Sequence, residues 1–272
     1  MAIFIGLIIG LVLGLTGAGG SIFAVPLLIL FLDLSINEAI GIALGAVAAS
    51  ALIGSLSNWR SRSILWVPAL ALGSGGAIIA PLGKELGRQL PPTLLLIGFC
   101  TLASIVALLM WRQTLHSPEK ARIVRSINVS GENTQDPLCR LNQNGSFNLS
   151  SKCFFGLIVC GLLVGLLSGL FGVGGGFLIV PALLFTTRIS MLHAVATSLL
   201  IISVISASGF TSFVMTNPSL DWTLLSQICL GGLLGMLTGR LLAKKIAGIQ
   251  LQRTFAGAVL AMIAITLVNG LS

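Results

Sequence analysis

The chain carries one glycine-broken apolar segment twice, once in each half. The first copy reads GLIIGLVLGLTGAGGSIFAVP from residue 6, and the second reads GLLVGLLSGLFGVGGGFLIVP from residue 161. Seven landmark residues recur at a constant offset of 155 positions. They are Gly6, Gly10, Gly14, Gly17, Gly19, Gly20 and Pro26, and then Gly161, Gly165, Gly169, Gly172, Gly174, Gly175 and Pro181. The repetition indicates a duplicated membrane fold with a special site where the helices break.

The composition indicates that this fold lies in a membrane. Hydrophobic residues make up 56% of the 272 residues and charged residues only 8%, and the mean hydropathy is +1.06. A soluble domain cannot bury that much apolar surface. Lipid admits helices or closed barrels as spanning structures, and long apolar runs without alternation favour helices. We therefore expect an all-α polytopic membrane protein.

Each half contains four apolar segments. They span 3–32, 37–58, 63–83 and 91–111 in the first half, and 153–187, 190–214, 222–243 and 251–271 in the second. These boundaries predict a first membrane repeat over 1–111, a polar linker over 112–152 and a second membrane repeat over 153–272.

The net charge of +8 resides between the apolar runs, where basic residues set orientation and meet anionic headgroups. We therefore expect the lipid bilayer, and no nucleic acid, as a partner. Parallel halves would divide the fifteen Lys and Arg residues almost evenly between the two sides, whereas inverted halves leave only Lys84 and Arg88 on one side. The positive-inside rule favours inverted repeats in the inner or plasma membrane, with a cytoplasmic linker and both termini outside.

An odd number of crossings in each half requires one segment to return to the side from which it entered. Residues 3–15 and 22–32 would form helices of about 20 Å and about 16 Å, shorter than a hydrocarbon core of about 30 Å. They predict a re-entrant hairpin whose tip lies near the midplane and meets the tip of the second copy. Two short, tilted crossings per broken segment remain the alternative.

The glycines at the breaks are candidate substrate contacts. Glycine adopts a positive φ at little cost, and amides at the start of the following helix attract an anion. Many secondary transporters bind substrate at such breaks. The candidates are Gly17, Gly19, Gly20 and Ser21 at the first break, and Gly172, Gly174, Gly175 and Gly176 at the second. For the earlier glycines of each copy the G-x-x-x-G spacing favours helix packing instead.

The paired breaks, each followed by an apolar stretch to Pro26 or Pro181, resemble the sulfite exporter family (TauE/SafE-like), as does HAVATSLL at 193–200. Members are permeases for sulfite and small sulfur-containing or organic anions, so the resemblance implies an anionic substrate. It also implies a hydroxyl contact at Thr197 and Ser198. The first half has Ile42 and Ala43 at the equivalent positions.

Further polar residues lie in or near the membrane segments. Asn58 is a candidate substrate contact, and a helix-end role is the alternative. Hydroxyls on membrane helices mostly bond to their own backbone, which is the expectation for Thr16, Ser50, Ser55, Ser57, Ser203, Ser206 and Ser208. We interpret Lys84 and Arg240, at equivalent segment ends, as snorkelling cations, with an anion entrance as the alternative.

Together these features predict a permease that binds a small anion near the midplane and moves it by alternating access, with a passive channel as the alternative. The membrane segments show no Ser-His-Asp set, metal-ligand cluster or paired carboxylate, so we expect no enzyme activity, cofactor or metal. The oligomeric state stays open, with a homodimer as one alternative.

Overall fold

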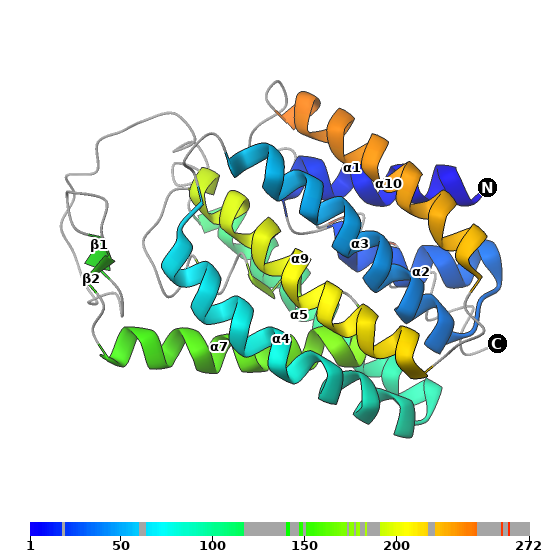
Figure 1. Cartoon of the computed structure of the whole chain (residues 1–272), viewed down its shortest axis with the longest axis horizontal. Helices are drawn as coiled ribbons and strands as arrows, with labels where there is room; N and C mark the ends of the chain where they lie inside the picture. Colours follow the sequence, from blue (N-terminus) through cyan, green and yellow to red (C-terminus); the bar gives the residue numbers. More distant parts are fainter. Residues whose placement is uncertain are drawn as a thin grey trace.

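The computed structural model is a bundle of apolar helices (Figure 1). The structure describes residues 1–17, 20–59, 64–116, 140–141, 147–148, 151–172, 174–176, 178–179, 183, 191–216, 221–243, 257 and 261. The helices are α1 (Ala2–Thr16), α2 (Gly20–Leu32), α3 (Ile36–Trp59), α4 (Trp66–Gln89), α5 (Pro92–His116), α7 (Ser151–Phe171), α9 (Met191–Thr216) and α10 (Trp222–Ala243).

Within the described residues, five helices are long and apolar enough to cross a membrane, namely α3, α4, α7, α9 and α10. The prediction of a helical, polytopic membrane fold is therefore confirmed. The linker adds a small hairpin in which β1 (Arg140–Leu141) pairs antiparallel with β2 (Phe147–Asn148). The predicted segment 251–271 lies outside the described residues except for positions 257 and 261.

Side-chain caps fix where two of the long helices begin. At the start of α3, Glu38 accepts a hydrogen bond from the Ser35 backbone at 3.3 Å, and the Ser35 hydroxyl accepts one from the Glu38 backbone at 3.4 Å. This reciprocal pair is a capping box. At the start of α10, Asp221 accepts hydrogen bonds from two backbone N–H groups at 2.9 and 3.1 Å. Glu38 and Asp221 therefore serve helix initiation.

The first helix of each half packs against a helix of the other half. On α1, the glycine stripe lies against the α10 backbone at Ile228, Gly232 and Met236, in that order. On α7, the equivalent stripe lies against the α4 backbone at Leu72, Gly76 and Ala80. Since both partners advance together, α1 runs parallel to α10 and α7 runs parallel to α4. The contacts agree with the packing role expected for these glycines.

The equivalent helices α3 and α9 lie side by side and antiparallel in the middle of the bundle (Figure 1). A Cβ placed on Gly54 would lie 3.3 Å from Leu199, and one placed on Gly209 would lie 3.2 Å from Leu44. Gly54 and Gly209 are equivalent positions, and so are Leu44 and Leu199. The two halves therefore make the same contact reciprocally.

Each broken segment folds back on itself. A Cβ on Gly20 would lie 2.6 Å from the Ile9 carbonyl oxygen, so α2 returns directly along α1. At the second break, Gly175 lies in the same way against Val164, the equivalent of Ile9. The two entry helices differ in length, because α7 has 21 residues and α1 has 15. At 1.5 Å per residue α7 is about 32 Å long, enough to reach across a hydrocarbon core.

Candidate functional site

The two entry helices end at glycines in the left-handed region. Gly17 has φ 74° and Gly172 has φ 68°, a conformation that other residues adopt at a cost. The Gly17 N–H donates to the Leu13 carbonyl at 2.8 Å, and the Gly172 N–H donates to the Ser168 carbonyl at 2.9 Å. Both ends are therefore glycine C-caps of the same kind.

The expectation that the two tips meet is wrong for these glycines. Gly17 lies against Val195 near the start of α9, whereas Gly172 lies against Ile40 near the start of α3. Because α3 and α9 are antiparallel and Gly41 contacts Phe213, the two positions are about 27 Å apart along α9 at 1.5 Å per residue. The tips lie far apart because the entry helix α1 follows its partner α10 as far as Arg240, which carries Gly17 to the end of the bundle where α9 begins.

The predicted hydroxyls on α9 hold other parts of the chain. Thr197 accepts a hydrogen bond at 3.0 Å from the Leu65 N–H, which precedes α4. Ser198 donates to the Gly17 carbonyl at 3.1 Å and to the Val195 carbonyl at 2.9 Å. Both side chains are fully buried. These bonds join the start of α9 to the first half of the chain.

The remaining first-half candidates lie at helix ends. Asn58, next to the last residue of α3, accepts a hydrogen bond from the Arg240 guanidinium at 2.7 Å. This contact fits the alternative interpretation of Asn58 as a helix-end residue. Ser21 is fully buried in the first turn of α2. The prediction for Gly19 falls outside the described residues.

The second break reaches the middle of the bundle. Gly174 has φ 66°, and a Cβ placed on it would lie 2.5 Å from the Ser206 hydroxyl of α9 and 3.0 Å from Val47 of α3. Next to it, a Cβ on Gly175 would lie 3.3 Å from the Ser168 side chain of α7. Gly176 is also buried. Backbone and hydroxyl groups of three elements therefore meet where α3 crosses α9.

Three buried hydroxyls lack a hydrogen-bond partner among the described residues, namely those of Ser50, Ser168 and Ser206. Their side chains are 0%, 1% and 0% exposed. A buried hydroxyl without a partner costs about 1–3 kcal/mol, so each such group requires an explanation. Two of them, Ser168 and Ser206, flank the second break. Ser168 is not among the predicted site residues, although it lies in the repeated motif where the first copy has Leu13.

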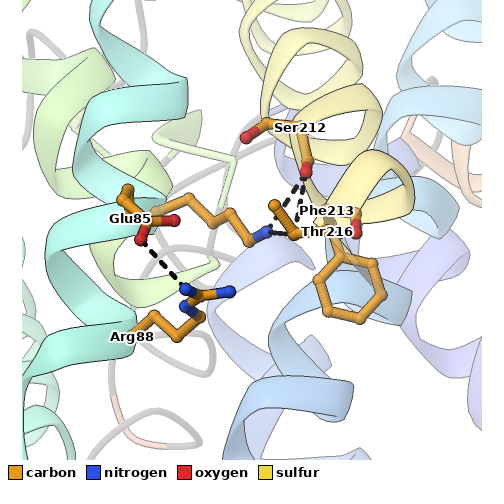
Figure 2. Close-up of polar contacts among 6 residues, drawn as sticks. Glu85, Arg88, Ser212, Phe213 and Thr216 are labelled. Carbon is orange, nitrogen blue, oxygen red and sulfur yellow. Dashed lines mark hydrogen bonds and ion pairs between the residues drawn. The ribbon is translucent and has the colours of Figure 1, made fainter. Parts of the chain in front are cut away.

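Lys84 and Arg240 bind the carbonyl ends of the central helices. The Lys84 ammonium donates to the Ser212 carbonyl at 3.2 Å and to the Thr216 hydroxyl, and it lies 5.2 Å from the centre of the Phe213 ring. Figure 2 shows Ser212, Phe213 and Thr216 at this end of α9, facing the end of α4 that carries Glu85 and Arg88. Lys84 is only 7% exposed, so the snorkelling interpretation is wrong for it.

At the opposite end of the pair, Arg240 of α10 donates to the Ser57 carbonyl of α3 at 3.1 Å. Ser57 and Ser212 are equivalent positions in the two halves. Each cation therefore neutralises the negative carbonyl end of a central helix from the other half. Among the described residues, no group of three or more His, Cys, Asp or Glu side chains could hold a metal ion.

A bundle of long apolar helices in two reciprocally packed halves, with one broken segment reaching its centre, defines a multi-pass membrane protein of the kind found among transporters. The sulfite exporter TauE/SafE family matches residues 2–266, and the chain belongs to this family. The resemblance predicted from the glycine breaks is therefore confirmed. The chain is a membrane transporter, with the bilayer and a small solute as its partners.

Similar proteins are described in the same terms. The chain is 30% identical over 258 residues to a "Probable membrane transporter protein" of Xylella fastidiosa (strain 9a5c), covering 94% of this chain and 89% of that protein. It is 26% identical over 239 residues to the "Probable membrane transporter protein YdhB" of Bacillus subtilis (strain 168), covering 88% of each. No solved structure matches the chain.

Proposed function

We propose that this transporter is a permease for a small anion of the sulfite type, bound at the second glycine break in the middle of the bundle. The observation that carries the proposal is the contact of Gly174, between α3 and α9, with the Ser206 hydroxyl, which has no partner among the described residues. Non-helical backbone at membrane depth is tolerated where it is buried or lines a cavity. Buried donors without partners are the groups that an anion would satisfy.

The proposed site uses the predicted glycines in two ways. At the second break, Gly174, Gly175 and Gly176 line the substrate position, followed by a helix whose first amides favour an anion. Leu178 and Ile179 both donate to the Gly175 carbonyl, which supports a helix start there. Seven other candidates shape the site from a distance through their packing and hydrogen bonds: Gly17, Gly20, Ser21, Asn58, Gly172, Thr197 and Ser198.

Movement of the anion follows from inverted repeats over 1–111 and 153–272, joined by the cytoplasmic linker 112–152. The antiparallel contact between the equivalent helices α3 and α9 supports this arrangement. Two similar halves of opposite orientation can exchange conformations, which opens a central site alternately to each side. The transporter works without a catalytic step, and both termini face outside.

Flux assays in proteoliposomes test the substrate. We expect saturable uptake and efflux of labelled sulfite, counterflow driven by unlabelled sulfite, and competition by thiosulfate or sulfoacetate, with sulfate, which has one more oxygen than sulfite, as the comparison. Saturation without counterflow would favour a passive channel. Absence of flux with all four anions would contradict the proposed substrate class.

A further inference from the structure

Two buried positions beside the second break carry hydroxyl groups that their equivalents in the first half lack. Ser206 and Ser168 flank the second break, and their equivalents in the first half are Ala51 and Leu13. All four side chains are buried. Both positions are therefore buried in each half, and they carry hydroxyl groups only in the second half.

We propose that Ser206 and Ser168 form a one-sided binding site, meaning a site at the second break alone. Their hydroxyls donate hydrogen bonds to a small oxyanion held against Gly174 and Gly175. This inference rests on the proposed function and assigns the substrate contacts to one break. A Cβ on Gly174 would lie 2.5 Å from the Ser206 hydroxyl, so only a glycine leaves this hydroxyl beside bare backbone. Ser168 reaches the next residue of the same turn from α7.

The surroundings select the ligand by size and by hydrogen-bonding type. Val47 and Ile202 approach Gly174, so apolar side chains from both central helices close the position. The polar groups are two neutral hydroxyls, which both donate when the ligand offers acceptor oxygens. The site therefore takes a compact oxyanion with at least two free oxygens, and it excludes a bulky organic chain.

The third unpartnered hydroxyl serves as an internal comparison. Ser50 of α3 is directed at α10, because a Cβ on Gly232 would lie 2.5 Å from its oxygen. Gly232 packs against Gly10 of α1 and is not part of either glycine break. Ser50 is thus as buried and as unsatisfied as Ser206 but lies outside the proposed site.

The test compares Ser206→Ala and Ser168→Ala with Ser50→Ala in sulfite flux and in ligand-dependent thermal stability of the purified protein. Loss of a hydrogen bond to a charged ligand should raise the KM for sulfite about tenfold in each of the first two variants. It should also abolish the increase in unfolding temperature that sulfite causes in the wild type. Ser50→Ala should keep the wild-type KM and the full stabilisation by sulfite.

A second pair of variants separates binding from folding. Ser206→Cys retains the size of the side chain with a weaker donor and should raise the KM while leaving the ligand-free unfolding temperature unchanged. Ala51→Ser places a hydroxyl at the equivalent first-half position and should leave the KM unchanged. Wild-type KM and stabilisation in both Ser206→Ala and Ser168→Ala would overturn the one-sided site, as would an equal effect of Ser50→Ala. If the wild type itself neither transports nor binds any of the anions, the proposed function fails first.

Discussion

At the residue scale, the positive φ of the break glycines makes substitution costly whatever the substrate. In Gly174→Ala, the added methyl group would lie 2.5 Å from the Ser206 hydroxyl in a backbone conformation that alanine disfavours. We expect transport to be lost and the free energy of unfolding to fall by about 1–3 kcal/mol. Sulfite flux and thermal unfolding of the purified variant measure the two effects.

Gly73→Ala is the matched control for this prediction. Gly73 lies inside α4, and a Cβ placed on it meets no atom within 4 Å. Alanine is favoured over glycine in a helix by about 0.5–1 kcal/mol, so this variant should transport normally and unfold at the same or a higher temperature. Normal transport by Gly174→Ala would mean that this glycine does not line the path.

The buried serines show which residue-level features a sequence can predict. Ser198 bonds to the carbonyl of Val195, three residues earlier, as expected for hydroxyls on membrane helices. Ser206 lies on the same helix, but its hydroxyl faces Gly174 and has no partner among the described residues. The difference depends on what packs against each helix face. Periodicity alone does not contain that information.

At the scale of the helices, the glycine stripes determine how closely α7 approaches α4. A Cβ on Gly165 would collide with the Gly76 carbonyl, a backbone atom that moves only with its helix. We expect Gly165→Ala to destabilise the protein by about 1–3 kcal/mol through overpacking, seen as a lower unfolding temperature. On the same helix Gly156 has open space around its Cβ position. Gly156→Ala should therefore be neutral, and equal effects would argue against close packing as the cause.

The two cations Lys84 and Arg240 act on helix ends. Lys84→Met removes the charge that neutralises the last carbonyls of α9, and should lower the free energy of unfolding by about 1–2 kcal/mol. Arg240→Met should do the same at the end of α3, because it binds the equivalent carbonyl. Thermal unfolding of each variant gives the comparison.

Arg88→Met is the control for these cations because it carries the same charge on the same helix. Arg88 is exposed and pairs with Glu85 at 3.3 Å, and an exposed pair contributes only about 0–1 kcal/mol. A loss of stability in Arg88→Met as large as in Lys84→Met would show that general charge, rather than the helix end, is responsible.

At the scale of the whole molecule, the repeat predicted most of the helices but not their pairing. The predicted pieces 3–15 and 22–32 correspond closely to α1 and α2. The sequence does not predict that α1 packs on α10 and α7 on α4, because a G-x-x-x-G stripe indicates close approach of two helices but does not identify the partner helix. The same limit explains the wrong placement of the tips, since the depth of each break depends on the partner that its entry helix follows.

The membrane orientation is a separate prediction of the charge distribution. Inverted halves put the linker in the cytoplasm and the end of α4 outside, because Lys84 and Arg88 are the exceptions to the positive-inside rule. Of the five native cysteines, Cys139 lies in the linker, so a variant that retains it alone should react with a membrane-impermeant thiol reagent only after permeabilisation. Gln89→Cys, at the exposed last residue of α4, should react in intact cells when every native cysteine is replaced. The reverse labelling pattern would invert the topology, whereas labelling of both positions from one side would contradict the odd number of crossings between them.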